Sequence, residues 1–330
     1  MGKLRIYQYN SMRAVCLLLV STLLLAQEPD TTIKVDVDIV NILFTVRDKR
    51  GGLIGNLNKE DFTIAEDSKQ QEIKYFTRET DLPLTIGLLI DVSRSQENLI
   101  EIEKNAAYQF FGSVLRPKDL AFLISFGAEA ELLQDYTNSV KLLRSGLDGL
   151  KVNADFGGVL NPGPVPTVYQ PRGTILYDAV YLAAADQLKG QVGRKVLILI
   201  TDGEDQGSRY DIKRAIESAQ KADAVIYGIY YVDRAFYYQN GITFGGVSDS
   251  ALRRLSEETG GHVFHVDKKN SLQDTFKEIQ DEMRSQYAIG YTPTNSTKDG
   301  GFRRIDIHTN SKDWKVQARR GYFATQREKQ

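Results

Sequence analysis

The chain has 330 residues, of which 42% are hydrophobic and 26% charged, and it carries a formal net charge of −1. This composition excludes a disordered or fibrous protein and leaves room for one large and one smaller globular domain. A charge so close to zero gives no sign of the basic patch that nucleic-acid binding requires.

Residues 1–26 are typical of a secretory signal peptide. Lys3 and Arg5 precede an apolar stretch, Ala14–Ala26, which polar residues follow. The stretch has 13 residues, whereas a span of the bilayer takes about 20. The only cysteine, Cys16, lies within it, so the mature chain would have neither disulfides nor thiolate sites. We therefore expect a secreted, periplasmic or cell-envelope protein with no membrane span after cleavage.

Residues 27–81 have the pattern of an N-terminal β segment. Apolar and polar residues alternate over 33–39 and again over 42–46, as they do in strands with one buried face. Two further short strands are predicted over 61–67 and 72–76. Because the segment has no long helical period, we expect a small unit of β-sandwich type.

Strands and helices alternate over residues 82–285. The first strand, Leu84–Asp91, is an apolar run without polar alternation, which is typical of a strand buried on both faces. Further strands are predicted over 119–126, 128–133, 195–200, 224–232 and 261–266. Helices are predicted over 96–115, 139–147, 176–188, 210–222, 248–258 and 271–284. This order predicts an α/β fold with a doubly wound, mostly parallel sheet and helices on both faces.

Two segments interrupt this alternation. Residues 157–173 are rich in Gly and Pro and are predicted to form a long loop. Asn240 and Gly241 are predicted to form the tip of a hairpin within residues 237–243. The aromatic residues between positions 230 and 238 are interpreted as core or loop packing, with a binding surface as the alternative.

Residues 286–330 return to a β pattern. Short strands are predicted over 287–291, 302–308 and 314–318. This tail is too small to bury a core alone. Since β segments flank the α/β region on both sides, we expect the two to pair into one small domain.

Oxygen-bearing side chains occur at three places that should meet at one edge of the sheet. The first place holds Asp91, Ser93 and Ser95, directly after the opening strand. The others hold Thr174, just before a helix, and Asp202, at the end of another apolar strand. Ligands of open α/β sheets bind at the carboxyl ends of the strands. Carboxylate and hydroxyl oxygens suit a hard divalent cation such as Mg²⁺.

The order Asp-x-Ser-x-Ser, then Thr, then Thr-Asp-Gly resembles that of von Willebrand factor type A domains with a metal-ion-dependent adhesion site. The resemblance covers about Leu82–Arg284. The flanking segments, which include NKEDFTIAEDSKQQEI and YAIGYTPTN, are similar to those of a bacterial family of VWFA-related domain proteins.

The resemblance implies a set of five metal ligands. Three hydroxyls would ligate the ion directly, and two carboxylates would do so directly or through water: Ser93, Ser95, Thr174, Asp91 and Asp202. Asp205 ranks below Asp202 as an alternative or supporting carboxylate. The implied ion is Mg²⁺, with Mn²⁺ or Ca²⁺ as alternatives.

The function that the resemblance implies is a non-enzymatic binding or adhesion module. Its metal would complete its coordination with an Asp or Glu side chain of a protein partner. Two alternatives stay open: a metal-dependent hydrolase or phosphatase, and a structural assembly subunit whose metal only braces the loops. Catalysis is disfavoured because Ser93 stands where a phosphatase of the haloacid-dehalogenase type has its second Asp, the general acid.

Overall fold

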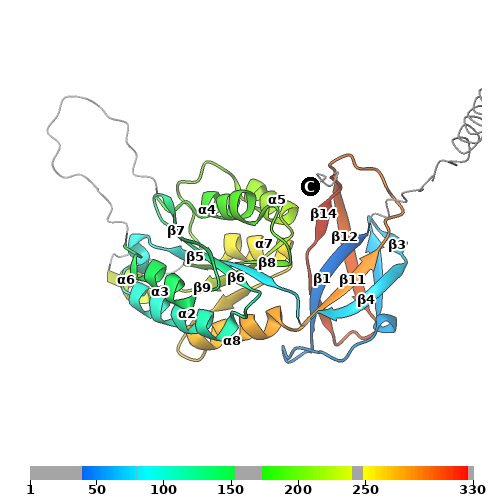
Figure 1. Cartoon of the computed structure of the whole chain (residues 1–330), viewed down its shortest axis with the longest axis horizontal. Helices are drawn as coiled ribbons and strands as arrows, with labels where there is room; N and C mark the ends of the chain where they lie inside the picture. The colour runs from blue at the N-terminus through cyan, green and yellow to red at the C-terminus, as the bar shows by residue number, and fades with distance from the viewer. Residues whose placement is uncertain (1–38, 80, 153–172, 240–247, 326–330) are drawn as a thin grey trace, which may run out of the picture. The chain divides into compact units, whose positions relative to one another are not determined.

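The structure is a computed structural model that describes residues 39–79, 81–152, 173–239 and 248–325 (Figure 1). These residues all belong to one compact unit, Asp38–Gln330. The predicted signal peptide and the predicted hairpin tip lie outside the described residues, as do nearly all of the strand predicted over 33–39 and of the loop predicted over 157–173. Within them, no helix has both the length and the hydropathy needed to cross a membrane.

A six-stranded sheet, in the order β10-β9-β8-β5-β6-β7, forms the centre of the α/β part. Its strands are β5 (Leu84–Asp91), β6 (Leu120–Phe126), β7 (Ala130–Thr137), β8 (Arg194–Thr201), β9 (Ala224–Tyr230) and β10 (Val263–His265). All neighbours are parallel except β6 and β7, which are antiparallel. From β5 the chain winds outward through β6 and β7, and then returns to β8 on the other side of β5. The order therefore reverses between β5 and β8.

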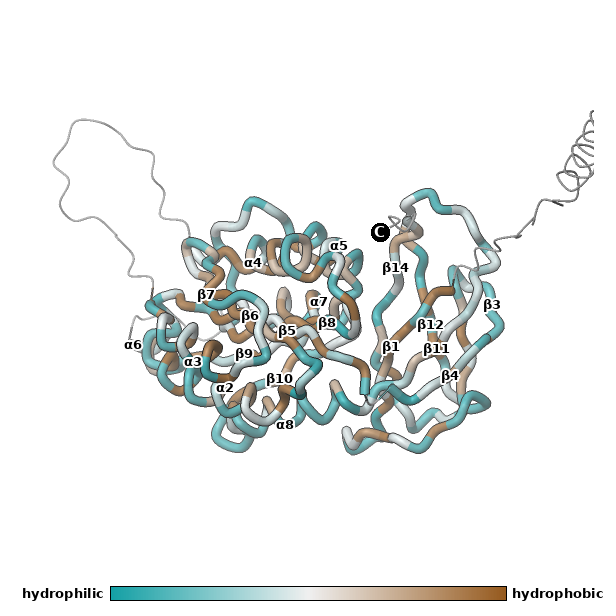
Figure 2. The backbone as a smooth tube through the Cα atoms, in the orientation of Figure 1, coloured by the Kyte–Doolittle hydropathy of each residue, from teal (hydrophilic) through white to brown (hydrophobic). Residues whose placement is uncertain are grey.

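Helices cover both faces of this sheet (Figure 1). On one face pack α2 (Ile100–Val114), α3 (Val140–Asp148) and α8 (Leu272–Met283). On the other pack α4 (Leu176–Leu182), α5 (Ile212–Lys221) and α7 (Ser250–Thr259). Every residue of β5 is buried, and hydrophobic residues concentrate on the central strands (Figure 2). The predicted doubly wound, mostly parallel fold is confirmed.

The strands that precede and follow the α/β part pair with one another in two four-stranded sheets, in the orders β13-β1-β11-β4 and β14-β12-β2-β3. The strands are β1 (Val40–Arg47), β2 (Phe62–Glu66), β3 (Lys69–Gln71), β4 (Ile73–Glu79), β11 (Gln286–Tyr291), β12 (Phe302–Thr309), β13 (Lys315–Ala318) and β14 (Gly321–Phe323). A short 3₁₀ turn, η2 (Lys59–Asp61), precedes β2. A separate hydrophobic core, which includes Phe44, Phe62 and Tyr287, fills this unit. The two flanking β segments thus pair with one another in this unit.

Three helical segments differ from the sequence prediction. The helix expected over 96–115 begins with a short 3₁₀ turn, η3 (Arg94–Gln96), before α2. The helix expected over 176–188 continues past α4 as the π-helical segment η4 (Ala183–Leu188). Residues 234–239 form helix α6 (Arg234–Gln239) rather than the arm of a hairpin, so that prediction was wrong for residues 237–239. Asp233 starts the helix, because its Oδ1 accepts hydrogen bonds from the backbone N–H groups of residues 235 and 236.

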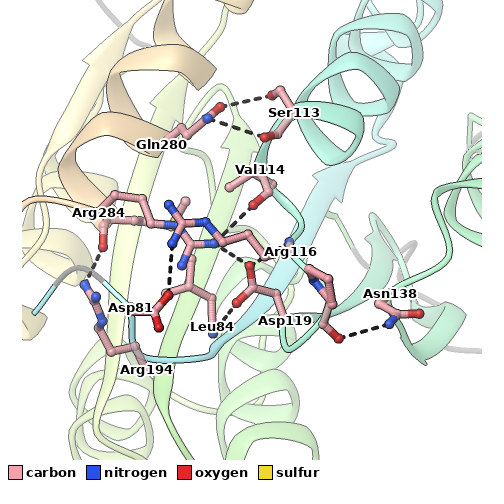
Figure 3. A network of polar contacts seen from close by, with 12 residues as sticks. Asp81, Leu84, Ser113, Val114, Arg116, Asp119, Asn138, Arg194, Gln280 and Arg284 are labelled. Atoms are coloured by element: carbon pink, nitrogen blue, oxygen red, sulfur yellow. Dashed lines mark hydrogen bonds and ion pairs between the residues drawn. The ribbon is translucent and has the colours of Figure 1, made fainter.

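A polar network fixes the amino-terminal end of β5 (Figure 3). The buried Asp119 carboxylate accepts a hydrogen bond of 2.8 Å from the backbone N–H of Leu84 and forms an ion pair with Arg284. Arg284 also donates to the carbonyl of Val114, 3.1 Å away. This network joins β5 to the ends of α2 and α8. It lies at the opposite end of β5 from Asp91, where the candidate site is found.

Candidate metal centre

The two aspartates of the predicted site lie side by side at the point where the strand order reverses. Asp91 is the last residue of β5, and Asp202 directly follows Thr201, the last residue of β8. Both are buried, with exposures of 0% and 1%. Ligands of doubly wound sheets bind in the crevice at this reversal. The neighbouring strands β5 and β8 therefore bring together residues that are more than a hundred positions apart in the chain.

Hydrogen bonds connect the first and third motifs directly. The Ser95 hydroxyl donates to Asp202 Oδ2 over 2.5 Å, and the hydroxyls of Ser93 and Ser95 are 3.1 Å apart. The backbone N–H of Ser93 donates to Asp91 Oδ1 over 2.9 Å. Both serines are half-buried, so their hydroxyls line the side of the aspartates that solvent can reach.

Turn geometry at the end of β8 aims Asp202 at this crevice. Gly203 has a φ of +87°, and a Cβ at that position would lie 2.9 Å from the carbonyl oxygen of Ser248, so only glycine fits. The Gly203 N–H donates to the Thr201 hydroxyl, which in turn donates to Asp91 Oδ2 over 2.6 Å. Thr201, to which the sequence analysis gave no role, thus links the two aspartates.

Thr174 reaches the same edge of the sheet through its backbone. Its carbonyl accepts a hydrogen bond from the N–H of Gln206 over 2.9 Å, and the next residue, Ile175, donates to the carbonyl of Gly127 at the end of β6. Thr174 therefore lies between the loop after β6 and the loop after β8, and it is 8% exposed.

Asp205 has a role of its own at the start of α4. Its Oδ1 accepts hydrogen bonds from the backbone N–H of Tyr177, over 3.1 Å, and from the hydroxyl of Ser208, over 2.5 Å. These contacts hold the helix that follows Thr174. They engage one of the two carboxylate oxygens of Asp205.

Tyr237 is part of the site, although the sequence analysis interpreted its aromatic cluster as packing. The Tyr237 hydroxyl donates to Asp202 Oδ2 over 2.6 Å, so this oxygen accepts from both Tyr237 and Ser95. Burial and the Asp202 charge raise the pKa of Tyr237 far above its ordinary value. Asp233 orients the helix that carries Tyr237, and it also accepts a hydrogen bond from the side chain of Asn98.

A third carboxylate, Glu103, lies beneath the site on the buried face of α2. It is completely buried, and neither of its carboxylate oxygens has a hydrogen-bond partner. Burial and then the charges of Asp91 and Asp202 raise its pKa well above the ordinary value. Gln96 is also fully buried with its side-chain amide unpartnered. The sequence did contain a signal for Glu103, because an acid three positions after Ile100 falls on the apolar face of the helix.

The site carries an excess of buried negative charge. Burial, followed by repulsion from Asp202, raises the pKa of Asp91 to about 7, against the lowering effect of hydrogen bonds from Thr201 and Ser93. In the part of the chain that the structure describes, no salt bridge involves Asp91, Asp202 or Glu103. Buried carboxylates without a counter-charge are costly, and a cation would remove that cost. The residues present therefore fit a cation.

The donors at this site are hydroxyls as well as acids. Across the described ranges, no group of three or more His, Cys, Asp or Glu residues is arranged to hold a metal. A cation bound here would accordingly depend on two carboxylates, on the serine and threonine hydroxyls, and on water. Such a mixed oxygen set with few carboxylates is the usual environment of Mg²⁺ in proteins.

The fold and the crevice define a class: doubly wound α/β domains with an oxygen-lined site where the strand order reverses. The family model of the von Willebrand factor type A domain matches residues 165–278. The matched residues include Thr174 and Asp202 and lie downstream of Asp91. Domains of this family are generally interaction modules and bind a divalent metal.

Solved structures with a similar fold have low sequence identity to this chain. An aerotolerance-related membrane protein from Bacteroides fragilis is 16% identical, with a TM-score of 0.42 over 61% of this chain and 98% of its own. Proximal thread matrix protein 1 from the mussel byssus, with a zinc-occupied MIDAS motif, is 13% identical, with a TM-score of 0.45 over 63% and 50%. The SpRpn10 VWA domain is 16% identical, with a TM-score of 0.37 over 60% and 95%. A search of curated protein sequences found no significant match.

Proposed function

We propose that this chain is a non-enzymatic, extracytoplasmic binding protein that captures an acidic side chain of a protein partner through Mg²⁺. The metal would be held by the residues that the sequence analysis selected: Asp91, Ser93, Ser95, Thr174 and Asp202. The observation that carries the proposal is the pair of buried, uncompensated aspartates at the reversal of the strand order, bordered by hydroxyls that solvent can reach. The cleavable signal peptide predicted over residues 1–26 supports export from the cytoplasm.

Each residue has a separate task in this proposal. Asp91 and Asp202 supply the negative charge that draws a cation into the crevice, and Thr201 keeps the Asp91 carboxylate in position. Ser93 and Ser95 supply neutral oxygens, so the positive charge is incompletely balanced on the solvent side. A bound Mg²⁺ would supply that charge and an open coordination position, to which a carboxylate from outside is attracted.

The test is recovery of a partner from the native cell envelope or medium with the purified chain as bait. We expect the partner to be recovered in Mg²⁺, to be lost in a chelator, and to be lost with Asp202→Ala. Glu131→Ala, which removes an exposed acid from β7, serves as the matched control. Recovery that survives both the chelator and Asp202→Ala would refute the proposal. A lower melting temperature in chelator with unchanged recovery would instead support a bracing metal.

Cation affinity should rise with pH up to about pH 7 and then level off. The pKa of Asp91 is raised to about 7, so below that pH the cation must displace a proton from its carboxylate. One displaced proton corresponds to a gain of at most about tenfold in affinity per pH unit. Calorimetric Mg²⁺ titrations at pH 5.5, 6.5, 7.5 and 8.5 measure this directly. An affinity that does not change across this range would contradict the assignment of Asp91.

Tyr237→Phe should strengthen cation binding. The substitution removes one of the two hydrogen bonds to Asp202 Oδ2 and so frees that oxygen for the metal. A hydrogen bond to a charged group contributes about 1.5 kcal/mol or more, so we expect a gain of about tenfold or more. Tyr238→Phe is the control, because Tyr238 is 87% exposed. If Tyr237→Phe weakens binding instead, its hydroxyl helps to hold the cation.

A further inference from the structure

A groove runs between strand β13, at the edge of one sheet of the β-sandwich, and strand β12 of the other sheet. Its cavity volume is about 550 Å³. Residues 304–308 of β12 and 315–320 in and after β13 form two sides, and residues of α7 and β10 complete it. The groove does not include any of the metal-site residues, and the proposed function does not use it.

The groove exists because one stretch of chain changes sheets. After β12 the chain turns and runs back as β13, which pairs with β1 in the first sheet. It then crosses to the second sheet, where β14 pairs with the start of β12. The later half of β12 therefore pairs with β2 on one side only, and β13 pairs with β1 on one side only.

Backbone hydrogen-bonding groups of β12 point into the groove. The N–H of Ile305 donates to the carbonyl of Arg320 on the groove side. Because the polar groups of a strand alternate between its two sides, the N–H and C=O of Ile307 face the same way. The residues before Arg320 belong to β13 in the first sheet, so the backbone groups of Ile307 border the groove rather than a neighbouring strand.

The edge of β13 is open around Val316 and covered beyond it, because Arg320 donates its N–H to the carbonyl of Glu258 and Gly260 lies against the backbone of residues 318 and 319. Val46 of β1 accepts a hydrogen bond from Ile54 on the side away from β13. Thr45 and Arg47 must then face β13, where they lie opposite Gln317 and Lys315. By alternation, the backbone groups of Val316 point outward into the groove.

The side chains give the groove an apolar floor and a basic rim. Ile307, Val316 and Ala318 are partly buried against the core of the sandwich. Six basic residues line the groove, namely Arg47, Arg253, Arg304, Lys315, Arg319 and Arg320, against two acids, Glu257 and Asp306. Arg47, Arg253 and Arg319 form ion pairs with Glu282, Asp249 and Asp223, which lie outside the lining, so the basic rim consists mainly of Arg304, Lys315 and Arg320. The pairs of Arg304 with Asp306 and of Arg320 with Glu257 are exposed and 3.4 and 3.7 Å long. Such pairs contribute little to stability, so a carboxylate from a ligand can replace the acid.

We propose that this groove binds an extended, acidic segment of another protein as an added β-strand. The open edges supply main-chain hydrogen bonds, the floor takes alternate apolar side chains, and the rim takes the acidic ones. The need for main-chain donors and acceptors favours a polypeptide over an anionic polysaccharide. This binding is independent of the metal, so it should persist in chelator and in Asp91→Asn.

The test uses the purified chain and a fluorescent, end-blocked octapeptide of alternating Val and Glu, followed by anisotropy in chelator. We expect saturable binding that weakens with salt, and none with a matched Val–Lys peptide. Replacing two Val residues of the peptide by Pro removes main-chain N–H groups without changing its charge and should abolish binding. Equal binding of the Pro-containing peptide, or absence of binding by the Val–Glu peptide, would overturn the proposal.

Two double variants of the protein test whether the peptide binds in the groove. Arg304→Glu combined with Lys315→Glu reverses one charge on each strand and should weaken binding about tenfold, the sum of two modest ion-pair effects. Lys69→Glu combined with Lys312→Glu makes the same charge change outside the groove and should leave binding within about twofold. Equal weakening by both pairs would show that only net charge matters, and would overturn the proposal. The proposal would also be overturned if a sulfated polysaccharide displaced the peptide and bound equally well to the two double variants.

Discussion

Asp91→Asn is expected to lower cation affinity at least about a hundredfold while the fold is retained. The substitution removes one of the two buried charges that attract the ion, at a site with few other carboxylates. The amide oxygen of the new side chain can still accept the hydrogen bond from the N–H of Ser93. Its amide nitrogen can donate to the Thr201 hydroxyl, which in the parent donates to Asp91 Oδ2. Without metal, the variant should be at least as stable as the parent above pH 7, since repulsion between Asp91 and Asp202 is gone.

The measurement is a Mg²⁺ titration by calorimetry together with thermal unfolding in chelator. Asp205→Asn is the matched control, because Asp205 lies three positions after Asp202 but holds the start of α4 through Tyr177 and Ser208. We expect it to change cation affinity by less than about fivefold and to cost stability through the lost charge-assisted hydrogen bonds. A larger loss of affinity in Asp205→Asn than in Asp91→Asn would reverse the ranking of the two carboxylates.

The sequence predicted the features of the fold that depend on local pattern. The unbroken apolar run of β5 indicated a strand buried on both faces, and every residue of β5 is buried. Alternation of strands and helices then implied a doubly wound sheet, in which the ends of β5 and β8 meet. This is why Asp91, Ser95 and Asp202 could be grouped before their contacts were known.

The residues that the sequence missed act through contacts across long distances in the chain. Tyr237 reaches Asp202 only because residues 234–239 are helical, and the Asn-Gly pair at 240–241 suggested a hairpin instead. The cap supplied by Asp233 decides the conformation of residues 234–239. Thr201 was noted only as the first residue of the Thr-Asp-Gly motif, because its hydrogen bond to Asp91 depends on β5 being the neighbour of β8.

The unpartnered carboxylate of Glu103 should make the metal-free protein less stable as pH rises. Burial raises its pKa well above the ordinary value, so between the pKa values of the unfolded and folded states the unfolded chain releases a proton that the folded chain keeps. The free energy of unfolding then falls by about 1.4 kcal/mol per pH unit. Below the unfolded-state pKa this effect vanishes.

Glu103→Leu removes the titrating group and fills the same buried position on α2 with an apolar side chain. We expect the variant to gain stability relative to the parent as pH rises from 5 to 7. Urea unfolding in chelator at pH 5, 6, 7 and 8 measures the difference. Glu101→Leu, which replaces an exposed acid on the same helix, should show no such trend.

The outcome of Glu103→Leu also bears on the cation. If Glu103 only destabilises the protein and does not help to hold the cation, its removal should change Mg²⁺ affinity by less than about threefold. The reason is that a neutral carboxyl exerts little attraction on an ion. If the charge of Glu103 helps to retain the cation, affinity should fall together with the gain in metal-free stability. A variant that is less stable at every pH would contradict the prediction, since Glu103 would then have to be held by a polar partner rather than buried without one.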